Sequence, residues 1–161
     1  MDFLKESVKI AIRKSLDSLA SAHPGESVCG YALLTDDDLQ CLGYHAITKE
    51  RLEKGGSELR FQITDWPYAD GSDAFDQPRE LMVENAEKSQ ERYKMHVDAC
   101  FGALVVAMKE LRDSHVFHEN VFLTVASTDP SDYLERLEHA VVQNLNSDSI
   151  FSEWQAWISM F

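Results

Sequence analysis

The sequence predicts an α+β fold, in which a small antiparallel sheet of about four strands packs with an N-terminal helix, a long central helix and C-terminal helices. Stretches with apolar residues three and four positions apart, the spacing of amphipathic helices, occur at both ends and in the second half of the chain. Short runs that suit a pleated sheet lie between them. No internal repeat or shift in composition divides the 161 residues, so we expect one domain over residues 1–161.

The first helix is predicted from an apolar stripe near the start of the chain. Most of the charged residues of this segment lie off the stripe, as in an amphipathic helix on a protein surface. His23-Pro24-Gly25 ends it, because proline cannot continue a helix and glycine tolerates the exit turn. The stripe consists of Phe3, Leu4, Val8, Ile12, Leu16 and Leu19.

Three strands are predicted next, at residues 28–34, 39–48 and 59–64. Asp36-Asp37-Asp38 separates the first two and indicates a hairpin connection. In the third, apolar and polar residues alternate, which favours a strand with one buried face. Residues 49–56 form a polar excursion with room for one short helical turn. Because the links are short, the three strands are expected to form an antiparallel meander.

The second half of the chain is predicted to be mainly helical. Residues 65–78 lack periodicity and are expected to form a loop, with Pro78 well suited to begin a helix. The apolar spacing then predicts these elements: one helix or two over 79–112 with a break near Ser89-Gln90, a link over 113–120, a fourth strand over 121–127, a helix opened by Asp129-Pro130 and ending near 144–146, and a helix over 149–161.

Charge is the unusual feature of the composition. Fifteen Lys and Arg stand against 28 Asp and Glu, a formal net charge of −13. Nucleic-acid binding requires clustered cations, and anionic membranes also attract basic segments, so neither is an expected partner. The longest apolar run, residues 99–108, is about half the length of a membrane span. The N-terminus lacks a secretory apolar run, and Cys29, Cys41 and Cys100 form no C-x-x-C pair, which together predict a cytoplasmic protein with reduced thiols.

Motifs for catalysis or metal binding are weak. His115-x-x-His118 has no third ligand nearby in sequence, and His96 and Cys100, one helical turn apart, have apolar neighbours that suggest the interior. The Asp65–Asp76 segment fails the calcium-loop pattern in both registers tested. The sequence carries no G-x-S-x-G, phosphate-binding loop or dinucleotide fingerprint. We therefore expect no cofactor, no metal and no enzymatic activity.

An acidic surface with aromatic anchors is the candidate binding site. A basic protein would be captured faster by such a surface, and buried Trp and Tyr side chains carry much of the energy of protein interfaces. Two other interpretations remain open: the acids are simply solvated, and Trp66-Pro67-Tyr68 fills part of the core. The predicted partner-binding residues are Asp36, Asp37, Asp38, Trp66, Tyr68, Asp70, Asp73 and Asp76.

Several short motifs follow one another along the chain in a characteristic order. They are Gly30-Tyr31-Ala32-Leu33, Gly43-Tyr44, Trp66-Pro67-Tyr68, the helical set from Phe101 to Leu111, Ser127-Thr128-Asp129-Pro130 and Asn144-Leu145-Asn146. Their order and spacing resemble the bacterial family called domain of unknown function (DUF) 4303, over nearly the whole chain. Small acidic families of this kind look like immunity proteins encoded beside polymorphic or contact-delivered toxins. The resemblance implies protection of the producer and carries over no catalytic residues.

These observations predict an immunity protein that binds a cognate bacterial toxin and neutralises it by stoichiometric occlusion. The expected toxin is a basic effector such as a nuclease, because nucleases bind phosphate. Two alternatives are an adaptor that self-associates through the helix carrying Trp154 and Trp157, and a small hydrolase that uses His45, His96 and Cys100 in a cleft between the sheet and the main helix. We expect a monomer or weak homodimer.

Overall fold

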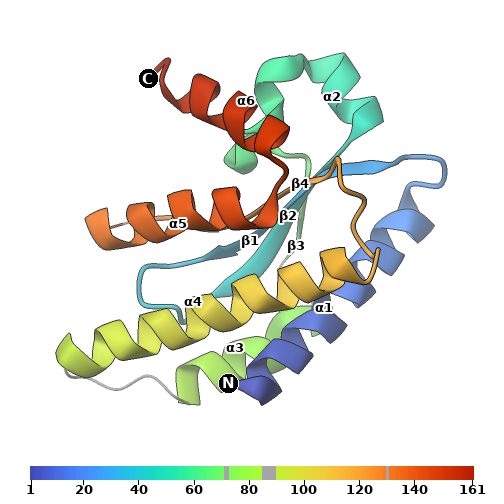
Figure 1. Ribbon diagram of the computed structural model, residues 1–161. Coiled ribbons are helices and arrows are strands. Elements are labelled where there is room, and N and C mark those ends of the chain that lie inside the picture. Colours follow the sequence, from blue (N-terminus) through green and yellow to red (C-terminus); the bar gives the residue numbers. More distant parts are fainter. Residues whose placement is uncertain (71–72, 85–89, 130) are drawn as a thin grey trace.

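The computed structural model describes residues 1–70, 73–84, 90–129 and 131–161, apart from the side chains of Asp70, Gln90 and Glu91 (Figure 1). It confirms an α+β fold that opens with a helix. The elements in chain order are α1 (Asp2–Ala22), β1 (Val28–Thr35), β2 (Leu42–Thr48), α2 (Lys49–Gly55), the 3₁₀ turns η1 (Ser57–Arg60) and η2 (Ile63–Asp65), β3 (Tyr68–Asp70), the 3₁₀ turn η3 (Asp73–Phe75), α3 (Asp76–Glu84), α4 (Gln90–Asp113), β4 (Phe122–Ser127), α5 (Asp132–Leu145) and α6 (Asp148–Ile158).

The four strands form one mixed sheet in the order β3-β2-β1-β4. β1 and β2 make the predicted antiparallel hairpin, and β2 pairs antiparallel with β3. β4 instead lies parallel to β1, from Gly30 opposite Phe122 to Thr35 opposite Ser127, so the prediction of a wholly antiparallel sheet is wrong. The reason is that α3 and α4 carry the chain across the molecule before β4 begins, which is the long crossover that a parallel pair requires.

The strand predicted at residues 59–64 is not a strand. This segment forms η1 and η2, and the position beside β2 belongs to the three-residue β3, inside the predicted loop. The apolar residues of the segment pack into the core from these turns, with Phe61 against Phe122. Local bonds, such as Gln62 N–H to the carbonyl of Leu59, satisfy its backbone without a partner strand. The alternation of apolar residues in this segment therefore indicated correctly that they are buried, but it did not indicate a strand.

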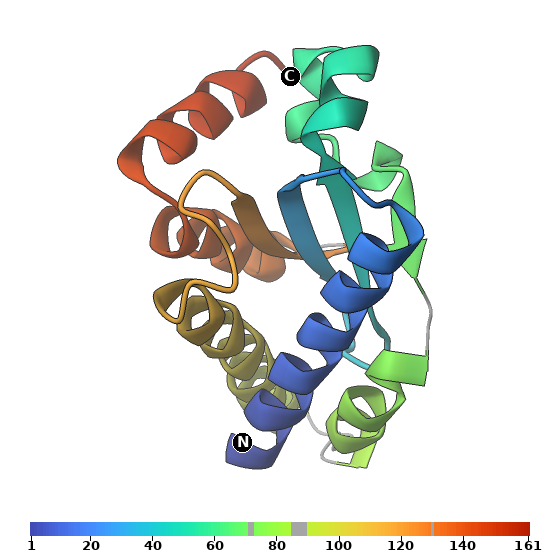
Figure 2. The same ribbon diagram turned by 90° about the vertical axis from the view of Figure 1, so that its right-hand side faces the viewer.

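Apolar side chains pack against both faces of the sheet. Tyr31 and Leu33 of β1 enter the larger core beneath α1, α3 and α4. Ala32 points the other way, into a smaller core with Phe122, the 61–66 segment and α6. Figures 1 and 2 show this division, with α1, α3 and α4 on one side of the sheet, α2 and α6 on the other, and α5 beside β4. The alternation of side chains along each strand thus serves two cores.

The helices largely follow the predicted pattern. Residues 79–112 divide into two helices near the expected break, where Ser89 lies outside the described residues. α4 buries one face in the larger core and leaves the side chains of Met95 and Val106 exposed. α5 begins at Asp132, later than the predicted Asp129-Pro130, with Pro130 outside the described residues. In the part of the chain that the structure describes, no helix is both long and apolar enough to cross a membrane.

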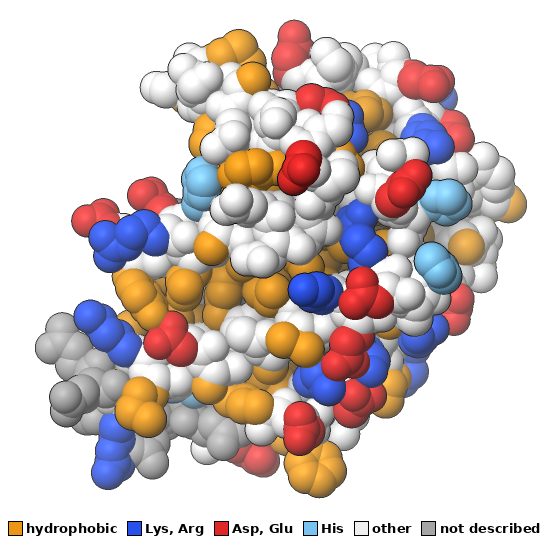
Figure 3. Space-filling view, viewed as in Figure 1, with side chains coloured by type: hydrophobic (Ala, Val, Ile, Leu, Met, Phe, Trp, Pro, Cys, Tyr) orange, Lys and Arg blue, Asp and Glu red, His pale blue; other side chains and the backbone are white. Residues whose placement is uncertain are grey.

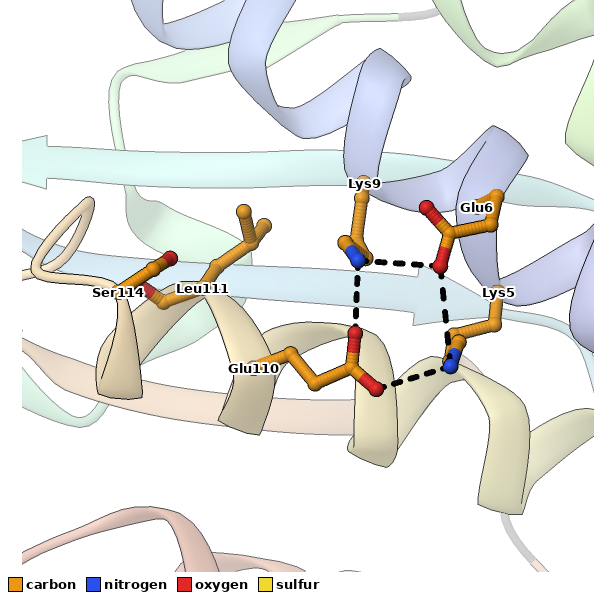
Figure 4. Close-up of polar contacts among 6 residues, drawn as sticks. All are labelled: Lys5, Glu6, Lys9, Glu110, Leu111 and Ser114. Atoms are coloured by element: carbon orange, nitrogen blue, oxygen red, sulfur yellow. Dashed lines mark hydrogen bonds and ion pairs between the residues drawn. The ribbon is translucent and has the colours of Figure 1, made fainter.

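An ion-pair cluster joins α1 to α4 (Figure 4). The Nζ atoms of Lys5 and Lys9 lie 2.9 and 2.7 Å from the two carboxylate oxygens of Glu110, and Glu6 contacts both lysines. Hydrogen bonds from the lysines hold the pKa of Glu110 below its usual value. Figure 3 shows acidic and basic side chains side by side over these two helices. The cluster neutralises its own charges, so we interpret it as a helix contact rather than a binding site.

Candidate functional site

The β1–β2 hairpin fixes the acidic triad at one end of the sheet. Asp36 Oδ1 accepts hydrogen bonds from the backbone N–H groups of Gln40 and Cys41, at 2.7 and 3.0 Å. The hydroxyl of Tyr93 on α4 donates to the carbonyl of Asp37 at 2.6 Å. Asp36 and Asp37 are half-exposed, whereas the side chain of Asp38 lies fully at the surface. Asp36 therefore shapes the turn, and Asp38 is the acid of the triad most available to a partner.

A second acidic segment reaches the same end of the sheet through β3. Asp70 lies opposite Tyr44, close to the start of β2, and its own side chain is outside the described part of the structure. Phe75 then packs on the ring of Tyr44, with the ring centroids 5.9 Å apart. Asp73 and Asp76, on either side of Phe75, are exposed. The structure thus brings together the two acidic clusters that the sequence predicted, with Phe75 as the anchor of the second.

A third acidic segment follows β4 and was missed by the sequence interpretation of this site. The parallel pairing puts the carboxyl ends of β1 and β4 side by side, and Thr128 N–H donates to the carbonyl of Thr35 at 2.8 Å. The exposed carboxylates of Asp129 and Asp132 consequently join the hairpin aspartates at this end. Asp76 forms an ion pair of 3.2 Å with Arg79. We call the other exposed aspartates, at positions 38, 73, 129 and 132, the acidic end of the molecule.

The predicted aromatic anchors do not belong to the acidic end. Trp66 is 3% exposed, its indole Nε1 donates to the carbonyl of Leu59 at 2.7 Å, and its ring lies over Gly30. Tyr68 is 9% exposed and its hydroxyl donates to Glu26 at 2.5 Å. Both side chains are buried, which favours the alternative that they fill part of the core over the prediction that they anchor a partner at the surface. The tryptophan follows the turn that carries Phe61 into the smaller core, which is why it is buried.

The residues considered for hydrolysis are not brought together. His96 and Cys100 face the larger core beneath α4, with the thiol 3.6 Å from Nδ1 of the imidazole. His45 lies on the opposite face of the sheet, where its Nδ1 is 2.9 Å from the carbonyl of Ile63. Burial lowers the pKa of His96 and raises the pKa of the Cys100 thiol to about 11. A thiol that keeps its proton at neutral pH is a poor nucleophile, so this pair is suited to packing.

We predict that one thiol of three reacts in the folded protein. Cys41 is exposed, whereas Cys29 and Cys100 are buried and burial raises the pKa of each to about 11. Titration with Ellman's reagent at pH 8 is expected to release one equivalent from the native protein and three in guanidinium chloride, because only the thiolate reacts and only Cys41 is accessible. Cys41→Ser should abolish the native signal, and a remaining equivalent would contradict the assignment.

The His115-x-x-His118 motif belongs to a helix terminus. His115 has a φ of 61°, its N–H donates to the carbonyl of Arg112, and Val116 N–H donates to that of Leu111. This is the Schellman arrangement that ends helices, normally with glycine at the left-handed position. The Arg112 guanidinium in turn donates to the carbonyls of residues 118, 119 and 121. Within the described residues no group of three metal-ligating side chains occurs, here or elsewhere.

A cleft of about 520 Å³ opens beside the smaller core, between the sheet and α6. Leu34 and Ser127, at the carboxyl ends of β1 and β4, line one side of it. Among the described residues that line the cleft, two are acidic, Asp65 and Glu138, and none is lysine or arginine. Three aromatic residues of the C-terminal segment, Trp154, Trp157 and Phe161, and Phe61 opposite them, contribute its aromatic walls. Carboxyl ends of parallel strands are a common place for ligands in α/β sheets.

Glu138 is the polar centre of this cleft. Its Oε1 accepts a hydrogen bond from the backbone N–H of Ser127 at 2.5 Å. Burial raises the pKa of its carboxyl to about 7, against the lowering effect of that hydrogen bond, and the nearby carboxylate of Glu135 raises it further. The group is therefore divided between its neutral and charged forms near neutral pH. A carboxyl with a shifted pKa inside a concave site is a recognised indicator of function.

The C-terminal helix is packed against the body of the protein. Trp154 and Trp157 are half-buried, and the ring of Trp157 lies 5.9 Å from that of Phe61. The ring of Phe161 meets that of Trp157 edge-on, with the centroids 5.3 Å apart. An ion pair of 2.6 Å joins Arg60 to Glu153 across the same contact. The helix therefore presents these tryptophans to the cleft, whereas Met160 and Phe161 at its end are exposed. Self-association through this segment stays an alternative prediction.

Comparison with known proteins identifies one family. The family described as domain of unknown function (DUF4303) matches residues 8–147, which runs from α1 to the end of α5 and includes Ser127 and Glu138. No curated protein and no solved structure matches the chain. The matched segment covers most of the sequence and holds all four strands. The chain therefore belongs to the DUF4303 family.

Proposed function

We propose that the protein is an inhibitory binding protein of the immunity type, which covers a basic toxin or effector with its acidic end. The observation that carries the proposal is the convergence of the hairpin, the η3–α3 segment and the β4–α5 loop, each bearing exposed aspartates, at one end of the sheet. With a net charge of −13 over the chain, such an end attracts a cationic partner and speeds its capture.

The acidic end is also held in place before any partner arrives. The Asp36 turn, the Tyr93 bond to the hairpin and the Thr128 bond to β1 tie its segments to α4 and to the sheet. A surface ordered in advance loses less conformational entropy on binding, which favours high affinity. Inhibition by occlusion needs such a surface and a matching partner, and it requires no reacting group.

Neutralising the acidic end should weaken partner binding. The variant Asp38→Asn/Asp73→Asn/Asp129→Asn removes three exposed charges, one from each segment, and spares Asp36, whose carboxylate shapes the turn. We expect binding to the cognate basic protein to weaken roughly tenfold or more at low salt, mainly through slower association. The partner used in this test is the product of the neighbouring gene, selected because it is toxic when expressed alone and harmless when expressed with this protein. Biolayer interferometry measures the rates, and growth under toxin expression measures protection.

The matched control removes three exposed acids from the opposite end of the sheet, Glu53→Gln/Glu58→Gln/Glu119→Gln. Both variants change the net charge by the same amount, so a purely global charge effect would weaken binding equally. The proposal requires the acidic-end variant alone to lose association rate and protection. Equal affinities for the two variants, or an acidic partner, would contradict it.

A further inference from the structure

We propose that the cleft between Glu138 and α6 receives an arginine side chain of the basic partner, which stacks on the tryptophans and pairs with the Glu138 carboxylate. That the arginine comes from a basic partner rests on the proposed function. That the cleft accepts a guanidinium group rests on the residues that line it.

The walls of the cleft fit a guanidinium group. Its aromatic side chains offer flat apolar surfaces, and Glu138 and Asp65 supply negative charge. Guanidinium is planar, weakly hydrated and always charged, so it stacks on aromatic rings and pairs with carboxylates at the same time. Lysine would bring a compact, strongly hydrated charge that gains less from such walls. At about 520 Å³ the cleft is large enough for one long side chain.

The fold requires a hydrogen-bond acceptor at position 138, but it does not require a charged one. The outer edge of β4 needs acceptors for its free N–H groups, and at Leu123 the neutral amide of Asn146 meets this need, with Oδ1 2.8 Å from the N–H. An amide at position 138 would serve Ser127 in the same way. A carboxylate is instead placed where burial opposes its charge. Among the described residues, moreover, no hydrogen-bond donor pairs with Oε2 of Glu138, which leaves this oxygen for a ligand.

The cleft adjoins the acidic end. Leu34 and Ser127, which line it, are followed directly in the chain by Thr35-Asp36 and by Thr128-Asp129. A basic protein seated on the acidic end therefore lies next to the opening, and one of its arginines needs only to reach past the ends of β1 and β4. Aromatic pockets that take an arginine are frequent centres of binding energy in interfaces.

The charges around Glu138 predict how binding depends on pH. Glu135 and His139 flank it on α5, Asp65 faces it from η2, and the Arg60–Glu153 pair lies between η1 and α6. The residues that β1 and β4 contribute to the cleft are uncharged. Glu138 must be ionised to pair with arginine. With a pKa of about 7, its ionised fraction is about tenfold greater at pH 8 than at pH 6, so we expect about tenfold tighter binding at pH 8.

The test titrates the intact protein with N-acetyl-arginine amide and with N-acetyl-citrulline amide, its uncharged isostere. Amide and indole N–H shifts in ¹H–¹⁵N spectra report binding at Ser127, Trp154 and Trp157. We expect the arginine probe to bind at least about tenfold more tightly than the citrulline probe at pH 8, because only the former pairs with a carboxylate. The inference would be overturned if the two probes bound with equal affinity, or if the N–H signals of these three residues did not shift on addition of the arginine probe.

Variants then locate the charge. Glu138→Gln keeps an acceptor for Ser127 N–H but removes the charge, and should reduce binding about tenfold at pH 8 and abolish the pH dependence. Its melting temperature at pH 8 should not fall. Glu135→Gln, on an exposed residue one turn earlier, should bind within twofold of the original, and His139→Asn should keep the pH dependence. Retained binding in Glu138→Gln, or lost pH dependence in His139→Asn, would overturn the role of Glu138.

Two further measurements distinguish a partner's arginine from a small molecule as the ligand, and this inference from the proposed function. Free L-arginine carries an extra ammonium and carboxylate, and binding at least tenfold tighter than that of the capped probe would assign the cleft to a small molecule and overturn the partner source. Glu138→Gln should also weaken the cognate toxin complex while leaving Asp38, Asp73 and Asp129 intact. If the arginine probe does not bind at the cleft but the acidic-end variant still loses protection, only this inference is overturned. If the arginine probe binds at the cleft but the acidic-end variant keeps its association rate and protection, only the proposed function is overturned.

Discussion

Trp66→Ala is expected to destabilise the protein by about 3–5 kcal/mol, the usual cost of removing a large aromatic side chain from a core. Trp66 is 3% exposed, packs edge-on to Phe122 and donates its indole N–H to the carbonyl of Leu59. The substitution leaves a cavity between the sheet and the 3₁₀ turns and removes the donor for that carbonyl. Urea unfolding followed by far-ultraviolet circular dichroism measures the change. A loss below about 1 kcal/mol would contradict the core assignment.

A double-mutant cycle with Gly30 tests the contact itself. A Cβ at Gly30 would lie 2.7 Å from the Trp66 ring and 2.8 Å from Ile47 Cγ2. Gly30→Ala is therefore expected to cost about 1–3 kcal/mol in the original protein. In the Trp66→Ala background the ring is gone, so the same change should cost less by at least about 0.5 kcal/mol. Trp154→Ala, at a half-buried site, is the matched control and should destabilise less than Trp66→Ala.

Arg112→Met is expected to destabilise the protein by about 2–4 kcal/mol, because hydrogen bonds from charged donors are worth about 1.5–3 kcal/mol each and these are not additive. The guanidinium donates to the carbonyls of His118, Glu119 and Val121, at 3.3, 2.8 and 2.5 Å. Methionine keeps much of the aliphatic packing and removes all three donors. The measurement is again urea unfolding, with amide hydrogen exchange of β4 as a second readout.

Arg112→Lys is predicted to restore only part of this stability, since an ammonium cannot span three carbonyls as a planar fork does. Arg136→Met, at an exposed position of α5, serves as the control and should change stability by no more than about 0.5 kcal/mol. Full rescue by lysine would show that charge alone matters at position 112. Unchanged exchange rates in β4 would show that the loop holds without the arginine.

Helices and strands differed in how well the sequence predicted them. The stripe of α1 and the 3–4 spacing of α4 and α5 identify helices because each buries one face, and burial sets the period. At residues 59–64 the same logic failed, since 3₁₀ turns brought Phe61 into a core without strand pairing. The parallel placement of β4 depends on where α3 and α4 lead the chain, which no local pattern encodes. β3 is only three residues long and has no recognisable period.

The site was predicted in part for the same reason. The aspartates of the hairpin and of the 73–76 segment are visible as charge runs, whereas Asp129 and Asp132 join them only through the β1–β4 pairing. Glu138 did leave a signal in the sequence. Leu134, Glu138, Val141 and Leu145 follow a 4-3-4 spacing, so a carboxylate stands on the apolar stripe of α5. An acid on a buried stripe indicates an unusual environment, and this pattern was overlooked.

The parallel pairing of β1 with β4 has a consequence for folding. Gly30 and Phe122 are neighbours in the sheet but 92 positions apart in the chain, from 122 minus 30. Contacts of such long range form late, because a large loop must close before any of them is gained. The β1–β2 hairpin is local and is expected to form first. The acidic end and the Glu138 cleft both need β4, so they are assembled last. A nascent chain acquires the acidic end only after β4 has left the ribosome, and the cleft only after α6 has followed it.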